Sequence, residues 1–458
     1  MQETQPSPNQ RSLHPGIEGK VVQSVRKVLI GAAMLSAVLP GSAVRAQSSE
    51  TVLPASATAF DRRAAQLVDL LEGRTAFAGF FAPSFQTAIP ETRFKAITTS
   101  LIAQHGRPLA VESATSTNGR AGAVQLRFKK GVATFTLDID AEGRAIGLQL
   151  TRFAMTNDSF AAVAAELAAL PGRTGFLVAE LDGTVIRPLA AANADAQFAV
   201  GSTFKLYVLD ELAAQIASGR RSWADVVPLS HLSFSSIATG NWPKDTPVTL
   251  QTLANWMISV SDNGATDTLI HLLGRETVEA RMRSAGHSAP SRNIPLLTTV
   301  EAFALKGNNF ATERAAFIAG DDRAQRSLID ANRHRLTLAN VDGISFSDGP
   351  RFIDSLEWFA SPNDIARAMA DLRARQSEAS MAAMTINNGV GPAPAADWSY
   401  LGYKGGSENG VLSMSLLGQR KSDGRWFVIT ASWNNPAANV AAEDLIGRVT
   451  RLLALAAK

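Results

Sequence analysis

The sequence predicts an α+β protein of two domains, a small one over residues 58–155 and a larger one over residues 156–458. Three observations lead to this prediction. The first region carries helical periodicity followed by short segments of alternating polarity. The second carries three short polar motifs set between helical and strand patterns. The chain has 458 residues, of which 46% are hydrophobic, which is ample for two sizeable cores.

The N-terminal part of the chain is predicted to direct export. Basic residues precede a twelve-residue apolar run at 28–39, and the small-residue sequence AVRAQ follows it. This is the layout of a secretory signal with cleavage after Ala46. We therefore expect a signal region over residues 1–46, a linker over residues 47–57, and a periplasmic or secreted protein. The apolar run is too short for a stable membrane anchor.

The small domain is predicted to pack helices against an antiparallel meander. Segments 61–73 and 94–106 carry apolar residues at helical spacing. Segments 123–130, 132–140 and 145–153 alternate apolar and polar residues, and turn residues separate them. The order of helices first and strands afterwards is typical of an α+β unit.

Three motifs in the larger domain can place a nucleophile, a proton relay and an anion anchor in one pocket. Ser202 and Lys205 open a helical pattern that ends at Gly219, and their spacing of three puts them on one helix face. Ser-Asp-Asn at 261–263 opens a second helical pattern, and Lys-Gly-Gly at 404–406 lies in a strand pattern. A serine hydroxyl needs a base within hydrogen-bond reach to act as a nucleophile at neutral pH. Together the motifs predict a serine acyl-transfer enzyme.

In this order the motifs resemble those of the class A β-lactamases, a family of penicillin-recognising serine enzymes. The likeness extends from about residue 157 to residue 458, through a hairpin pattern at 174–186, a capped helix at Ser361 and a closing strand, strand, helix order. It implies an antiparallel sheet flanked by helices, beside an all-helical lobe. The small domain resembles the cystatin-like or nuclear-transport-factor-like domains of some exported serine hydrolases, among them a two-domain enzyme of clavulanic acid biosynthesis.

The resemblance implies a catalytic role for four residues of the first two motifs. Ser202 would be the acylated nucleophile, and Lys205 its general base or proton relay. Ser261 would pass a proton to the leaving nitrogen. Asn263 would hold Lys205 and the amide of the substrate.

The third motif is implied to bind the substrate. Lys404 would support the serine of the second motif and attract a substrate carboxylate. Gly406 and Ser407 would line the substrate, and the backbone amides of Ser202 and Ser407 would form the oxyanion hole. The family usually has Thr or Ser after this lysine, whereas Gly405 stands here. One hydroxyl contact to the carboxylate is therefore missing.

The deacylating glutamate of class A enzymes has no clear counterpart. We find no ExxLN-type pattern between the second and third motifs. Glu301 is the nearest carboxylate to the expected place, and Glu357 is the next. The alternative for Glu301 is an ordinary capping or helix-surface carboxylate. Acylation at Ser202 is therefore predicted, and efficient turnover of β-lactams is not.

The composition excludes several other classes of protein. The absence of cysteine excludes disulfides, thiolate metal sites and a lipoprotein anchor. The six histidines have no ligand spacing, so we expect no metal and no cofactor. The formal net charge is only +3 and the basic residues are scattered, so we expect no nucleic acid partner. The expected partner is a small β-lactam, peptide or ester substrate, and the sequence does not give the oligomeric state.

The leading interpretation is a β-lactamase-type serine hydrolase that opens a β-lactam or related amide or ester through acyl-Ser202. Such an enzyme would serve β-lactam breakdown and antibiotic resistance. One alternative is a penicillin-binding carboxypeptidase or an esterase of the same fold, which the missing glutamate favours. Another is a sensor or binding protein that is acylated without turnover.

Overall fold

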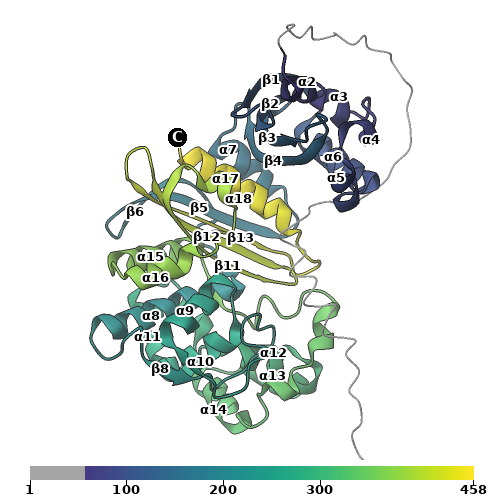
Figure 1. Ribbon diagram of the computed structural model, residues 1–458. Helices are drawn as coiled ribbons and strands as arrows, with labels where there is room; N and C mark the ends of the chain where they lie inside the picture. The colour runs from purple at the N-terminus through teal and green to yellow at the C-terminus, as the bar shows by residue number, and fades with distance from the viewer. Residues whose placement is uncertain (1–56) are drawn as a thin grey trace, which may run out of the picture. The chain divides into compact units, whose positions relative to one another are not determined.

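The computed structural model describes residues 57–458. The expected signal region over 1–46, and the linker except its last residue, therefore lie outside the described residues. The described chain divides into two compact units between Thr156 and Asn157, and each unit is described by itself (Figure 1).

The first unit places short helices before a four-stranded sheet. Its helices are α2 (Ala59–Ala65), α3 (Leu67–Leu71), α4 (Phe77–Phe80), α5 (Pro83–Ala88) and α6 (Glu91–His105), and its strands are β1 (Pro108–Ser116), β2 (Ala121–Phe128), β3 (Gly131–Ile139) and β4 (Ala145–Met155). The strands pair antiparallel in the order β1-β2-β3-β4. Val124, Leu126 and Leu137 on one face of this sheet are fully buried with Phe80 and Phe81 of the helical part. The alternation of polarity therefore reflects one covered face and one solvated face.

Several elements of this unit differ from the sequence expectation, and helices α4 and α5 lie outside the predicted segments. Strand β1 is not predicted, because its residues are mostly small or polar and the strand lies exposed at the sheet edge. The single helix expected over 61–73 is two helices, α2 and α3, separated at Gln66.

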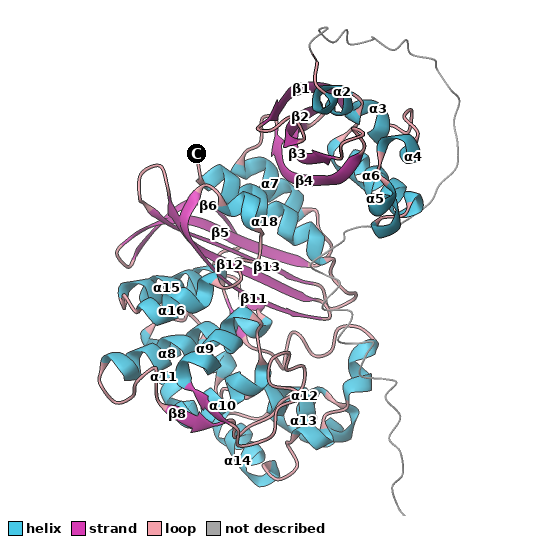
Figure 2. Ribbon diagram, in the orientation of Figure 1, coloured by secondary structure: helices cyan, strands magenta, loops and turns pink. Residues whose placement is uncertain are grey.

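The second unit contains a five-stranded sheet and a large helical region (Figure 2). Its main helices are α7 (Phe160–Ala168), α8 (Lys205–Ala217), α9 (Leu250–Ser259), α10 (Asn263–Leu273), α11 (Arg275–Ser284), α12 (Thr299–Lys306), α13 (Ala311–Ala319), α14 (Asp322–Asn332), α15 (Pro362–Ala374), α16 (Glu378–Thr385), α17 (Pro392–Ala395) and α18 (Ala442–Ala456). Its strands are β5 (Arg173–Asp182), β6 (Val185–Ala192), β7 (Phe198–Ala199), β8 (Val226–Pro228), β9 (Pro247–Thr249), β10 (Phe359–Ala360), β11 (Trp398–Glu408), β12 (Val411–Arg420) and β13 (Trp426–Asn434).

The sheet separates two hydrophobic cores. Its strands pair antiparallel in the order β11-β12-β13-β5-β6, so the third motif lies on an edge strand. Helices α7 and α18 cover one face, and their side chains pack with residues such as Phe176 and Leu416. Residues of the opposite face, including Leu417 and Val428, pack with helices of the helical region. The expected sheet flanked by helices beside a helical lobe is confirmed for this unit.

Among the described residues, no helix combines the length and the apolar character needed to cross a bilayer.

Candidate active site

The turn that carries Ser202 is clamped by two neighbouring segments. It is a 3-10 turn, Gly201–Phe204, that leads directly into α8. The Val200 amide donates to the Trp358 carbonyl at 2.9 Å, and β7 pairs with β10 just before the turn. The Phe204 ring stacks on the Trp358 indole with centroids 4.3 Å apart. These contacts fix the backbone of Ser202, whose side chain stays only partly buried.

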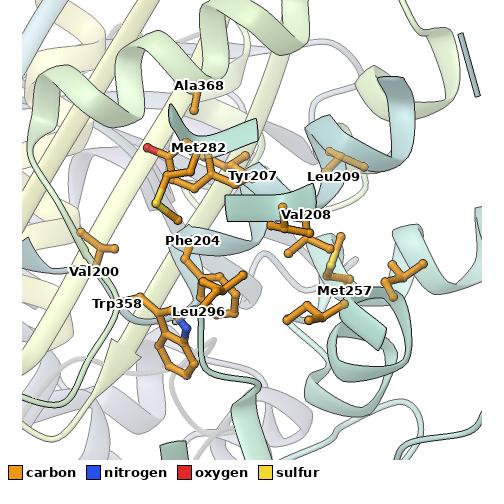
Figure 3. Close-up of a cluster of buried hydrophobic side chains, with 14 of the residues drawn as sticks. Val200, Phe204, Tyr207, Val208, Leu209, Met257, Met282, Leu296, Trp358 and Ala368 are labelled. Atoms are coloured by element: carbon orange, nitrogen blue, oxygen red, sulfur yellow. The ribbon is translucent and has the colours of Figure 1, made fainter. Parts of the chain in front are cut away.

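A hydrophobic core packs against this turn. Figure 3 shows Phe204, Leu296 and Trp358 side by side, with Val208 of α8 near them. All four side chains are buried, at 6% exposure or less. Because buried apolar side chains are close-packed, the turn has little freedom to move.

Lys205 is fully buried and hydrogen-bonded to the second motif. Its Nζ donates to the Asn263 Oδ1 at 2.6 Å, to the Ser261 carbonyl at 2.6 Å and to the Ser261 Oγ at 3.3 Å. Burial lowers the pKa of Lys205 from its ordinary value to about 7, although the carboxylates of Asp262 and Asp267 oppose this. A substantial fraction of this amine is therefore neutral near pH 7 and can accept a proton.

The second motif is held by the start of α10. Ser261 has a left-handed backbone, with φ at +59°, which is rare for a residue other than glycine. Asp262 caps the helix by accepting from the Ala265 amide at 2.8 Å, and it also accepts from the Thr239 amide at 2.9 Å. Asn263 donates through Nδ2 to the Phe234 carbonyl at 2.8 Å. These bonds direct the Ser261 hydroxyl toward the two motif lysines.

Lys404 approaches the same hydroxyl from the edge strand β11. Its Nζ donates to the Ser261 Oγ at 3.0 Å, and only 2% of the residue is exposed. Burial, together with the like charge of Lys205, lowers the pKa of Lys404 well below its ordinary value. Two buried lysines thus share one serine hydroxyl, and the charge of Lys205 disfavours the charged form of Lys404.

Gly406 and Ser407 bring β11 against the nucleophile. A β-carbon on Gly406 would overlap the Val200 carbonyl and lie 2.6 Å from the Ser202 backbone nitrogen. The Ser407 nitrogen lies 3.1 Å from the place of a β-carbon on Gly201. The amides of Ser202 and Ser407 are therefore neighbours, as an oxyanion hole requires.

The presence of glycine at position 405 has a steric reason that the sequence did not reveal. A β-carbon there would collide with the hydroxyl of Tyr403, and the Tyr403 ring is itself pressed against Gly389. Burial raises the pKa of Tyr403 to about 12, so the phenol stays protonated. The phenolic hydroxyl occupies the place where a side chain of residue 405 would begin.

We therefore expect Gly405→Ala to destabilise the protein by about 1–3 kcal/mol, the usual cost of overpacking. Chemical denaturation measures this change. Gly447→Ala in α18 is the control, because no atom lies within 4 Å of the new methyl group. Tyr403→Phe combined with Gly405→Ala should recover part of the loss, because it removes the colliding hydroxyl and keeps the ring. Equal stability of the wild type and Gly405→Ala would contradict the steric explanation.

Glu301, predicted as a deacylation base or alternatively as a capping carboxylate, is a capping carboxylate in the structure. Its Oε2 accepts from the Thr298 amide at 2.8 Å in a capping box that starts α12. Its Oε1 accepts from the Arg275 guanidinium at 2.7 Å. Both oxygens are therefore engaged in structural contacts, and neither is directed at Lys205 or Ser202. Glu357 is also engaged, in a buried ion pair with Lys306.

The structure brings together Ser202, Lys205, Ser261, Asn263, Lys404, Gly406 and Ser407. It adds Trp358 and Tyr403, which lie outside the signature residues of the three motifs. A cavity of about 230 Å³ lies between the segment 291–297, α13, α14 and the segment 355–359; Trp358 lines it, but no motif residue does. Among residues 57–458, no three acidic or histidine side chains are grouped as metal ligands.

Comparisons with known proteins agree with the motifs. Residues 158–388 match a family model described as the beta-lactamase enzyme family. This range contains the first two motifs and ends before Lys404. No curated protein matches this chain.

Solved structures similar to this chain include three that each overlap 64–65% of it. A beta-lactamase from Sphaerobacter thermophilus is 22% identical, with 97% of that chain covered and a TM-score of 0.46. A beta-lactamase from Chitinophaga pinensis is 18% identical, with 96% covered and a TM-score of 0.43. The structure of PBP-A is 14% identical, with 94% covered and a TM-score of 0.44.

Proposed function

Because this chain belongs to the beta-lactamase enzyme family, we propose that its larger unit is a serine hydrolase that opens a β-lactam, or a related amide or ester, through an acyl-Ser202 intermediate. One observation carries the proposal. Two buried lysines, Lys205 and Lys404, converge on the Ser261 hydroxyl beside the turn of Ser202. This arrangement supplies a base and a proton relay at a nucleophile without any metal ligand.

Acylation follows from these positions. Neutral Lys205 takes the Ser202 proton while the serine oxygen bonds to the substrate carbonyl carbon. The amides of Ser202 and Ser407 hold the resulting oxyanion. As that oxyanion collapses, the bond to the leaving nitrogen or oxygen breaks, and the Ser261 hydroxyl gives its proton to the leaving group. The proton on Lys205 then returns to Ser261, which restores both groups.

Recognition of the substrate is assigned to the third motif. Lys404 and the exposed Ser407 both lie on β11, and the Tyr403 hydroxyl occupies the place of a β-carbon on residue 405. These groups suit a substrate carboxylate.

Slow deacylation is the second candidate outcome, and the contacts of Glu301 favour it. That carboxylate is bonded to Arg275 and to the Thr298 amide, and these contacts favour a structural role for it over that of a base for water. An esterase, a carboxypeptidase or a stably acylated sensor would use the same acylation step. An ester substrate would also pass through an acyl-Ser202 intermediate. The rate at which that acyl group is hydrolysed therefore decides between these activities.

Export and the role of the first unit belong to the same proposal. The segment 1–46 would carry the protein to the periplasm or outside the cell, where cell-wall peptides and β-lactams are found. There the enzyme would contribute to β-lactam breakdown and antibiotic resistance. The four-stranded sheet with preceding helices is compatible with a cystatin-like or nuclear-transport-factor-like domain, as in the clavulanic acid enzyme that the sequence resembles.

The acylation rate is expected to rise with pH through about 7. The folded-state pKa of Lys205 is lowered to about 7, so the amine loses its proton, and becomes a base, as the pH rises past that value. Because Lys205 and Lys404 interact, the apparent pKa belongs to the pair. Stopped-flow acylation between pH 5 and 9 measures the profile. A rate that is flat through this range, or that falls as the pH rises, would contradict the role of a neutral lysine.

The test of the function uses three reagents on the full chain: a fluorescent penicillin, a chromogenic cephalosporin and a short-chain nitrophenyl ester. Covalent labelling and product are followed together. Rapid cephalosporin turnover supports a β-lactamase, and ester cleavage alone supports an esterase. Labelling without product supports the acylated sensor. No labelling and no product with all three reagents would overturn the proposal.

A further inference from the structure

A buried lysine between two glutamates lies outside the three motifs. Lys306 is the last residue of α12, and only 1% of it is exposed. Its Nζ lies 2.5 Å from the Glu357 Oε1 and 2.5 Å from the Glu408 Oε1. The two glutamates come from different segments, one before β10 and one at the end of β11. We call these three residues the Lys306 cluster.

The Lys306 cluster holds its lysine in the charged form. Burial opposes the charge of Lys306, but Glu357 and Glu408 outweigh it and raise the pKa of the lysine. Burial and the neighbouring Glu357 raise the pKa of Glu408 well above its ordinary value, while Lys306 opposes this. Replacing a buried ion pair with apolar residues often costs little stability, so a gain in stability is a weak explanation for such a cluster. Fixing one geometry is a better-attested use.

Both glutamates adjoin the backbone that clamps the nucleophile. Glu408 directly follows Ser407, whose amide neighbours that of Ser202. Glu357 directly precedes Trp358, whose carbonyl accepts from the Val200 amide. Lys306 therefore joins the two segments that hold the nucleophile turn from either side.

The other end of α12 is fixed to the second motif. Asp267 of α10 accepts from the Thr299 amide at 2.7 Å and from the Val300 amide at 2.9 Å, at the start of α12. The Thr299 hydroxyl also contacts the Asn263 carbonyl at 3.5 Å. Helix α12 thus runs from the helix of the second motif to the strand of the third, and Lys306 makes the final connection.

We infer that Lys306 is a positioning residue for the oxyanion hole: by binding Glu408 and Glu357 together, it fixes the Ser407 amide relative to the Ser202 amide. The inference rests on the proposed function for its catalytic consequence. Lys306 itself touches neither the reacting atoms nor the motif lysines in the contacts described, so its effect is on geometry. A loosened Ser407 amide would weaken stabilisation of the oxyanion more than binding of the substrate.

The experiment compares three variants of the full chain. Lys306→Met removes the connection, and Lys306→Arg keeps a cation that can bind both glutamates. Arg275→Met is the matched control, since it breaks a buried ion pair with Glu301 at the opposite end of the same helix. Acylation by the fluorescent penicillin gives the rate at saturation and the half-saturating concentration. Amide hydrogen exchange of residues 404–411 reports the order of β11 without any reaction.

Lys306→Met should lower the acylation rate at saturation by about 10- to 100-fold, somewhat less than the loss of a whole oxyanion-hole donor. The half-saturating concentration should change less than threefold. Lys306→Arg should recover most of the rate, and exchange in 404–411 should rise in Lys306→Met only. An unchanged rate and unchanged exchange in Lys306→Met, or equal effects of Arg275→Met, would overturn the inference.

Failure of the proposed function gives a different result. If the wild type is not labelled by the penicillin, the hydrolase proposal fails, while the exchange of 404–411 still decides whether Lys306 orders β11. Raised exchange in Lys306→Met alone would then support the positioning role, and unchanged exchange would overturn it.

Discussion

Ser202→Ala is expected to abolish covalent labelling by penicillin and to lower turnover at least about 10³-fold, because it removes the hydroxyl proposed to form the acyl bond. The change removes one oxygen from a side chain that is only partly buried, so folding should be unaffected. The backbone amides of Ser202 and Ser407 remain, so noncovalent binding of the substrate should persist. Mass spectrometry of the intact protein gives the adduct, and absorbance assays give the turnover.

The matched control is Ser399→Ala. Ser399 is an exposed serine near the start of β11, on the same strand as the third motif but at its far end. It should leave labelling and turnover unchanged. Persistent labelling of Ser202→Ala at the wild-type rate would show that another residue is the nucleophile and would contradict the mechanism.

The candidate catalytic residues could be predicted from the sequence because their chemistry is concentrated in short motifs. Ser202 and Lys205 are three residues apart, so they lie on one face at the start of a helix. Asp262 is a residue type that favours the helix N-cap, and it caps α10. Chain order then limits how these pieces can assemble. The contacts of Lys205 with Asn263 and Ser261 agree with the roles that the resemblance implies.

The supporting contacts could not be predicted, because they join residues that are distant in sequence. Lys306 lies 51 residues before Glu357 and 102 before Glu408, and no local pattern relates the three. The sequence left two roles open for Glu301, because a capping glutamate and a catalytic glutamate look alike in a sequence. Only its bonds to Arg275 and to the start of α12 distinguish them.

The small unit shows which strands alternating polarity can predict and which it cannot. Strands β2 and β3 alternate because one face of the sheet is covered, whereas the edge strand β1 has mostly exposed residues and no such alternation. In the same way, the glycine at 405 looked like a lost hydroxyl. The structure instead shows that the Tyr403 phenol fills that space.

Lys205→Met is expected to lower the acylation rate by about 10²- to 10⁴-fold, the usual contribution of a positioned general base. Methionine is unbranched and suits the buried site, but it cannot accept the Ser202 proton. The variant also leaves the Asn263 Oδ1 and the Ser261 carbonyl without their donor, at a cost of about 1–3 kcal/mol for each buried group. Denaturation must therefore accompany the kinetics, so that the loss of rate is measured on folded protein.

Lys205→Arg distinguishes a role of Lys205 as a base from a role of its positive charge. Arginine can donate to Asn263 and Ser261 as lysine does, but its pKa is too high for it to lose a proton in this pH range. If Lys205 acts as a base, Lys205→Arg should be as slow as Lys205→Met, and the rise in rate through about pH 7 should vanish in both. If Lys205→Arg keeps a rate within tenfold of the wild type, the positive charge is what matters. The base would then have to be Lys404, whose burial beside another lysine also favours its neutral form.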